Sequence, residues 1–405
     1  MIKNHRNDSG RFNVVHCIVN NLGGITSLTQ NLIRYNTNQS VHQELLALNI
    51  TDNKNEPAQF DSIIAENLEE FILNPKDNWY NTYNQLAIAF SKDSGVLVSN
   101  DQFDLIMLQA FNIPRKVVQL VHDPYNVELS KKFNAVIDGF IAHNRDIYNQ
   151  LINLFPERSL DIHYQPYGIP FDEKRILSKV KNKELKLLYL GRHDKEKGIY
   201  DLFEINTRLI AKGIVAQWYI LGKGPETESL KNQWSSQQNV TFILARDNDE
   251  VLDYAMKCDI LVFPTKFEGS PVAMLEAMSM GCVPVVTNLP GGIAETIDNA
   301  ENGFKCNIDK IDEFINAIEL LNSNRELLHN MQIKSHATVA SGFNVYKNTN
   351  LYVDVFKKYA TSSDSPRHHH VSLKIGSRLD QKWLPSFLTL ILRKCNPFKF
   401  SKIQK

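Results

Sequence analysis

Long apolar runs are missing from this sequence of 405 residues. No stretch approaches the roughly eighteen apolar residues that a membrane-spanning helix needs, and the polar start MIKNHRNDSGRF lacks the apolar core of a secretory signal. Cysteine is scarce too: there are five, without the CxxC or Cys/His spacing of a zinc site. Cys17, Cys258 and Cys282 fall in or beside predicted strands. We therefore expect reduced core cysteines in a cytoplasmic protein and no structural zinc.

Net charge is absent as well, because 45 Lys and Arg balance 45 Asp and Glu, and we expect no nucleic-acid partner. The balance is uneven along the chain. Residues 366–405 contain nine Lys or Arg and one Asp, a charge of +8, which leaves −8 for residues 1–365. Within this tail the block Trp383–Leu392 is mostly apolar. It predicts an interfacial segment on an anionic membrane surface, with a disordered tail or a helix packed on the body as alternatives.

The ordered part of the chain alternates between short apolar runs and helical segments, which indicates parallel sheets joined by crossover helices. A second series of this kind begins at about Lys186, so we expect an α/β protein of two doubly wound, Rossmann-like domains. The segment Thr51–Asn81 is rich in Asn and Asp and is expected to be a surface excursion. The predicted strands are Val14–Val19, Leu45–Ile50, Val96–Ser99, Asp104–Gln109, Lys116–Val121, Gly139–Ala142, Ala216–Leu221 and Asp259–Phe263.

Two carboxylates, Glu268 and Glu276, are separated by seven residues in the stretch FPTKFEGSPVAMLEAMSM. A strand ends just before Glu268, Ser270-Pro271 is predicted to cap a helix, and that helix is expected to run from Pro271 to Met280. The first turn of a helix has free N–H groups that bind anions. An acidic side chain beside such a helix end suits a ligand that carries both hydroxyls and phosphates.

Other candidates lie where predicted strands end. Gly23 and Gly24 form a tight turn between the first strand and a helix, where backbone can approach a ligand. Arg192 and Lys197 follow the first strand of the second series and could grip a diphosphate. Further glycine turns contain Gly222, Gly291 and Gly292, and His122 ends a strand, although a structural histidine is an equal alternative there.

These stretches resemble the retaining family 4 glycosyltransferases, from about residue 12 to 360 and most strongly from Lys186 to Phe304. The setting FEGSPVAMLEAMSMGCVPVV carries the resemblance, with GRHDKEKG and LPGGIAE in support. The family implies the GT-B fold, in which two Rossmann-like domains face across a cleft. The expected domains are an acceptor-side domain (1–170), a nucleotide-sugar-binding domain (171–344), a helix crossing back (345–362), and a basic, partly apolar tail (363–405).

The resemblance implies a role for each candidate. Glu268 contacts the transferred sugar, Glu276 the ribose, and Arg192 and Lys197 the diphosphate, while His122 lines the sugar pocket. The glycine-rich elements are expected to approach the donor with their backbone, and no metal or other cofactor is implied. These donor-binding candidates are Gly23, Gly24, Gly222, Gly269, Ser270, Pro271, Gly291 and Gly292.

The chain departs from the family pattern at Tyr167 and Pro170, where Asn and Asp are usual, and Ile243–Ala245 lack a customary glycine. The implied activity is transfer of a sugar, with retention, from a UDP- or GDP-linked donor to a glycan or lipid-linked hydroxyl in cell-surface polysaccharide synthesis, such as lipopolysaccharide or capsule. A nucleotide-sugar epimerase or hydrolase and a non-catalytic partner protein of the same architecture are the alternatives. We expect a cytoplasmic protein, peripheral on the inner face of the membrane.

Overall fold

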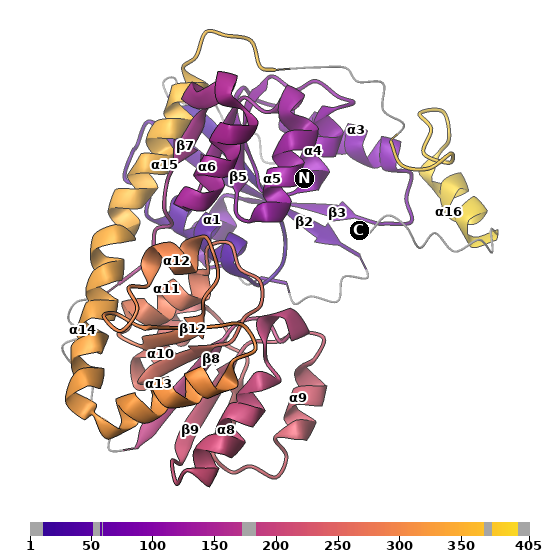
Figure 1. The fold of residues 1–405 in the computed structure, drawn as a ribbon. Helices are drawn as coiled ribbons and strands as arrows, with labels where there is room; N and C mark the ends of the chain where they lie inside the picture. The colour runs from indigo at the N-terminus through magenta and orange to yellow at the C-terminus, as the bar shows by residue number, and fades with distance from the viewer. Residues whose placement is uncertain (1–10, 52–56, 59, 172–183, 368–374, 396–405) are drawn as a thin grey trace.

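A computed structural model describes residues 11–51, 57–58, 60–171, 184–367 and 375–395. Two parallel sheets dominate the described chain, one above the other in Figure 1. The N-terminal sheet has the strand order β3-β2-β1-β4-β5-β6-β7 and the C-terminal sheet the order β10-β9-β8-β11-β12-β13. Helices cover both faces of each sheet, as parallel strands require. The structure thus has the predicted α/β architecture of two doubly wound domains.

The N-terminal sheet alternates with helices along the chain. Its strands are β1 (Phe12–Val19), β2 (Val41–Ile50), β3 (Leu68–Leu73), β4 (Gly95–Ser99), β5 (Arg115–Val121), β6 (Gly139–Ala142) and β7 (Ile162–Tyr164). The helices are α1 (Gly24–Arg34), α2 (Ser62–Glu66), α3 (Trp79–Phe90), α4 (Gln102–Leu108), α5 (Pro124–Phe133) and α6 (Arg145–Leu154).

The C-terminal domain repeats the pattern. Its strands are β8 (Leu185–Leu190), β9 (Ala216–Leu221), β10 (Val240–Ile243), β11 (Ile260–Phe263), β12 (Val283–Thr287) and β13 (Phe304–Cys306). Its helices are α8 (Asp201–Ala211), α9 (Thr227–Gln233), α10 (Asn248–Lys257), α11 (Val272–Ser279), α12 (Gly292–Thr296) and α13 (Ile311–Ser323). Three helices follow: α14 (Arg325–Gly342), α15 (Val345–Ala360) and α16 (Ser386–Cys395).

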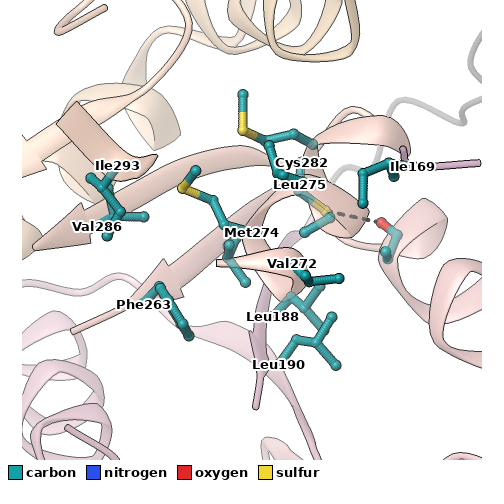
Figure 2. Packing of buried hydrophobic residues seen from close by; sticks show 14 of the residues in the cluster. Ile169, Leu188, Leu190, Phe263, Val272, Met274, Leu275, Cys282, Val286 and Ile293 are labelled. Atoms are coloured by element: carbon teal, nitrogen blue, oxygen red, sulfur yellow. Dashed lines mark hydrogen bonds between the residues drawn. The ribbon is translucent and has the colours of Figure 1, made fainter. Parts of the chain in front are cut away.

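Helix α11 is the centre of the C-terminal core. Most of its residues are buried, as expected of a helix that is apolar nearly all round. Figure 2 shows Met274 and Leu275 among side chains of the neighbouring strands. Cys282 donates to the carbonyl of Ala255 at 3.0 Å and is buried. Cys17, Cys258 and Cys306 are likewise buried and form no disulfide within the described residues, which confirms core positions for the three predicted cysteines.

Helix α15 returns to the N-terminal domain, as predicted. It packs on β1, β4 and β5, and Tyr352, Val353 and Phe356 are buried there. Figure 1 shows α14 and α15 running along one side of both domains. The charged segment Phe171–Glu184, which joins the two domains, lies almost entirely outside the described residues.

Three local predictions are wrong. Residues 104–108 belong to helix α4, with Gln109 following as its C-cap, and not to a strand, because Asp101 caps the segment by accepting from the Gln102 N–H at 2.5 Å. A short apolar run does not distinguish a buried strand from a buried helix. The excursion at 51–81 contains α2 and β3, which adds an edge strand parallel to β2. Ser270 does not cap α11 either: Pro271 stands at the cap, without a side-chain bond.

Candidate functional site

Two helix amino ends meet between the domains. Helices α1 and α11 are in contact, and a Cβ added to Gly24 would lie 3.1 Å from Cγ2 of Val272. Neither helix has an acidic residue in its first turn. Helix amino ends carry partial positive charge and N–H groups without partners in the helix. Gly23, which precedes α1, has nothing within 4 Å of its Cβ position, so this turn borders open space.

Lys197 and Glu268 form the closest ion pair of the candidate site. Lys197 ends the short helix after β8, and its Nζ lies 2.5 Å from Oε1 of Glu268 and 2.9 Å from the carbonyl of Phe267. The Glu268 side chain is only 13% exposed. Burial raises the pKa of Glu268, while Lys197 opposes that rise. The ion pair therefore offsets part of the cost of burying a charged carboxylate at this place.

Asp123 adds a second carboxylate from the opposite domain. It caps α5 by accepting from the Asn126 N–H at 3.0 Å. Burial raises the pKa of Asp123 and Lys197 lowers it, so the lysine acts on carboxylates of both domains. Sequence reasoning did not single out Asp123, although its position at the carboxyl end of β5 was an available signal.

Arg192 lies beside this pair but does not join it. Its guanidinium is 50% exposed and pairs with Asp194 at 3.3 Å. Its carbonyl accepts from the hydroxyl of Tyr189 at 2.9 Å. Burial, together with the charges of Glu268 and Asp194, raises the pKa of Tyr189, while Arg192 lowers it. A half-exposed arginine held by one ion pair can turn toward a phosphate without disturbing the core.

His122 is buried at the end of β5, and both its ring nitrogens have partners. Asn100 donates its amide to the carbonyl of Cys17, which leaves Oδ1 of Asn100 to accept from Nε2 of His122 at 2.9 Å. Nδ1 then accepts from the Tyr167 hydroxyl at 2.9 Å. Burial lowers the pKa of His122 to about 3, so the ring is neutral. A role in the sugar pocket remains a prediction for a histidine whose ring is fully bonded in this conformation.

The partners of His122 belong to a polar cluster that sequence reasoning missed. The ring of His143 stacks on His122 at 4.7 Å, and Nδ1 of His143 lies 2.6 Å from the hydroxyl of Tyr352 on α15. Tyr167, identified in the sequence only as a departure from the family pattern, joins this cluster. The only available signal was that departure, since the partners are far apart in the sequence.

Glu276 is buried in the second turn of α11. Its Oε1 is among the buried side-chain atoms of the described residues that have no hydrogen-bond partner. Burial raises the pKa of Glu276 to about 8, and a hydrogen bond from Asn248 counteracts this only in part. A buried acceptor without a donor is costly unless a ligand supplies one. Ribose hydroxyls are donors of this kind.

Glycines allow close backbone contact between the domains. A Cβ added to Gly269 would lie 2.0 Å from the carbonyl of His122, and Gly292 donates to the Gly269 carbonyl at 2.8 Å. Asn144 caps α6, and its amide also reaches Gly269 O at 3.2 Å and Ser270 Oγ at 3.0 Å. The predicted residues Gly269, Ser270 and Gly292 therefore meet at one seam. Gly291 lies there too, close to Asn144.

Glu295 completes this seam. Its Oε2 accepts from the backbone N–H of Arg145 at 2.7 Å, and its Oε1 accepts from the hydroxyl of Tyr164. Both donors belong to the N-terminal domain. Glu295 thus links α12 of the C-terminal domain to the N-terminal domain at the start of α6.

Gly222 supports the loop that carries Arg192. It has φ +134, and a Cβ there would lie 2.0 Å from the carbonyl of Gly191. Only glycine combines that backbone conformation with this approach. Gly222 packs against the Arg192 loop, while its predicted contact with a donor stays a prediction.

A separate cavity of about 340 Å³ lies at the amino ends of β1, β4 and β5, lined by residues such as Phe12, Ser94 and Lys116. The residues above gather at the opposite, carboxyl ends of the strands, where doubly wound sheets bind ligands. Within the described residues, no group of three or more His, Cys, Asp or Glu is arranged to hold a metal ion. The same residues contain no helix long and apolar enough to cross a membrane.

Known protein sequences resemble part of this chain. Residues 170–337 match the family of glycosyl transferases group 1. An uncharacterised glycosyltransferase of Haemophilus influenzae is 33% identical over 165 residues, which cover 40% of this chain and 46% of the relative. The UDP-Gal:alpha-D-GlcNAc-diphosphoundecaprenol alpha-1,3-galactosyltransferase of Escherichia coli is 28% identical, covering 34% and 36%. The capsular polysaccharide biosynthesis glycosyltransferase CapM of Staphylococcus aureus is 29% identical, covering 37% and 43%.

The chain spans less than half the length of these relatives. Solved structures match it over more of its length. Anabaena HepE in complex with UDP and glucose superposes with a TM-score of 0.68 at 14% identity, covering 86% of this chain and all of HepE. At this identity the likeness concerns the fold, which is that of the two-domain GT-B glycosyltransferases.

Proposed function

Because residues 170–337 match the group 1 glycosyl transferases in a chain with the GT-B fold, we propose that this protein is a retaining glycosyltransferase. It would move a sugar from a nucleoside diphosphate sugar to an acceptor hydroxyl. The observation that carries the proposal is the Lys197–Glu268 pair beside the meeting amino ends of α1 and α11. Cations, helix amino ends and one carboxylate at a single place suit a ligand with a diphosphate and a hydroxyl-rich ring.

The donor is held through both of its ends. Arg192 and Lys197 bind the diphosphate, and Glu268 accepts from hydroxyls of the transferred sugar. Glu276 accepts from the ribose, which would supply the donor that its Oε1 lacks. Of the UDP- and GDP-linked donors expected from the sequence, the names of the relatives favour UDP.

Departure of the diphosphate is the difficult step, because negative charge builds up on it as the sugar becomes oxocarbenium-like. Arg192, Lys197 and the amides at the starts of α1 and α11 are in place before the reaction and stabilise that charge as it develops. With two basic side chains in this role, we expect transfer without a metal or other cofactor. The C–O bond to the phosphate breaks, the acceptor oxygen bonds to the anomeric carbon on the same face, and the departing phosphate oxygen takes the acceptor's proton. Because the acceptor bonds on the face from which the phosphate leaves, the anomeric configuration is retained.

The acceptor is a hydroxyl of a glycan or a lipid-linked glycan, used in the synthesis of a cell-surface polysaccharide such as capsule or lipopolysaccharide. The names of the Escherichia coli and Staphylococcus aureus relatives support these classes. The acceptor would enter beside Gly23, where the turn borders open space. We place the protein in the cytoplasm, at the inner face of the membrane.

A panel of UDP- and GDP-sugars tests the proposal, with binding and slow hydrolysis measured with and without EDTA. We expect one donor to bind regardless of EDTA. Its hydrolysis should fall at least about a hundredfold in Arg192→Ala and Glu268→Ala. Arg208→Ala and Glu228→Ala are the matched controls, since both side chains lie on exposed helix surfaces and should leave hydrolysis unchanged.

Two outcomes would overturn the proposal. If no donor binds while the protein is folded, a non-catalytic partner protein is the better description. If a bound donor is converted to its epimer without an acceptor, the site is that of an epimerase.

A further inference from the structure

Helix α16 faces the solvent with its apolar side. Phe387 is 62% exposed, and Leu388, Ile391 and Leu392 are exposed as well. The spacing of these four residues places them on one face of the helix. The opposite face turns a polar residue, the fully buried Thr389, toward the protein. A helix on a globular surface normally has the reverse arrangement, with its apolar side inward.

Polar contacts hold this inverted helix on the N-terminal domain. Asp380 has no exposed side-chain surface and accepts from Nη2 of Arg393 at 2.7 Å. It also accepts from the backbone N–H of Trp79 at 2.7 Å, at the start of α3. Asn78 donates to the carbonyls of Gln381 and Leu384 at 2.9 Å and 2.7 Å. The segment is anchored through its polar groups, which leaves the apolar face free for another contact.

Exposed cations border the apolar face. Arg378, Lys382 and Lys394 are exposed, whereas the one acidic residue of the segment, Asp380, is buried against Arg393. Trp383 is 76% exposed and stands next to Lys382. An apolar face with an exposed tryptophan and neighbouring cations is typical of a segment that lies in the headgroup region of an anionic bilayer.

We propose that α16 and Trp383 dock the protein on an anionic lipid surface. Phe387, Leu388, Ile391 and Leu392 enter the boundary between headgroups and acyl chains, and Lys382 and Lys394 bind the headgroups. A second copy of this chain fits the face less well, because symmetric pairing would bring the same cations together. Figure 1 shows α16 beside α3, on the opposite side of the N-terminal domain from α15. The lipid surface would thus meet the acceptor-side domain.

The docking is independent of the proposed transferase activity, so it is tested by binding alone. Purified full-length protein is floated with vesicles of phosphatidylcholine containing about a third phosphatidylglycerol, and with pure phosphatidylcholine vesicles. We expect binding to the anionic vesicles and a blue shift of tryptophan fluorescence that Trp383→Phe abolishes. Trp218 and Trp234 are buried and should not contribute to the shift, and a contribution from the partly buried Trp79 would persist in Trp383→Phe.

Two pairs of variants separate the apolar and the electrostatic contributions. Phe387→Ser with Ile391→Ser should lower the partition coefficient about tenfold or more. Its control is Leu160→Ser with Val215→Ser, since these apolar residues are 84% and 66% exposed elsewhere on the surface. Lys382→Gln with Lys394→Gln should lower it about 25-fold, at about fivefold for each cation near the surface.

Lysine replacements outside the tail are the control for the electrostatic contribution. Lys131→Gln with Lys347→Gln removes two exposed cations from α5 and α15 and should leave binding unchanged. Equal loss in both lysine pairs would overturn the proposal, because binding would then follow total charge. Absence of vesicle binding would overturn it as well. So would concentration-dependent dimerisation that Phe387→Ser with Ile391→Ser abolishes, since a second copy would then cover the face.

Discussion

Glu276→Gln tests how strongly burial acts on the carboxyl group of α11. The rise in the pKa of Glu276 from 4.5 to about 8 means that the folded protein holds this group neutral. At about 1.4 kcal/mol for each tenfold change in proton affinity, the rise corresponds to about 5 kcal/mol. Glutamine is neutral at every pH and has nearly the same shape, so the variant does not incur this cost.

The sign follows from proton linkage. The folded-state pKa is raised, so the stability associated with the protonated group is full below pH 4.5 and is lost as the pH rises toward 8. The variant should therefore match the wild type near pH 4. It should exceed the wild type in unfolding free energy by about 3 kcal/mol at pH 7 and by about 5 kcal/mol above pH 8.

Urea unfolding at several pH values measures the difference between the two proteins, in which the other titrating groups cancel. Fluorescence of the buried Trp218 and Trp234 reports on the domain that contains Glu276. UDP binding provides the functional readout: wild-type affinity should rise with pH up to about 8, because the ribose needs an ionised acceptor, whereas the variant should bind weakly at every pH. A stability difference that stays constant from pH 4 to 9 would refute the reasoning.

Three further substitutions probe the seam between the domains. Lys197→Met removes the partner of the buried Glu268 carboxylate and should lower the unfolding free energy by about 2 kcal/mol and donor hydrolysis at least about a hundredfold; wild-type hydrolysis would contradict this. The methyl group of Gly23→Ala meets open space, so this variant should slow transfer without a change in Tm. The methyl group of Gly24→Ala presses on α11, so that variant should also lower Tm. Equal Tm values for the two variants would count against a tight contact between α1 and α11. Glu295→Gln removes the charge that accepts hydrogen bonds from the N-terminal domain and should weaken the contact between the domains by about 1 to 2 kcal/mol. We expect a larger radius of gyration in X-ray scattering; unchanged scattering would argue against this role of Glu295.

The sequence was sufficient for the parts of the fold that depend on local patterns. The strands from Val14 to Val19 and from Ala216 to Leu221 are mostly apolar runs, each interrupted by one polar residue, and the return helix at Val345 is amphipathic. Residues 104–109 were misassigned because their short apolar run suits both structures, and the capping by Asp101 decides between them. The strand β3 was missed because two of its six residues are glutamates, as an edge strand permits.

In the candidate site, too, residues in local motifs were predictable from the sequence, whereas contacts between distant segments were not. Lys197 and Glu268 were identified from motifs, and the structure brings them into contact from positions 71 residues apart. The surroundings of His122 could not be predicted, because Tyr167 and Asn100 come from different elements and contribute only through three-dimensional packing. The inverted face of α16 was likewise hidden, since composition reveals an apolar block but not which side of it the protein covers.

Helix α15 has a consequence for the order in which the protein is completed during synthesis. The sheet of the N-terminal domain leaves the ribosome first, but Tyr352, Val353 and Phe356, which cover β1, β4 and β5, are translated after the whole C-terminal sheet. The C-terminal sheet, by contrast, is contiguous from β8 to β13. The domain that is made first therefore waits with an uncovered apolar face until the last helices arrive. A nascent chain stalled before residue 345 should be a strong client for chaperones that bind exposed apolar surface.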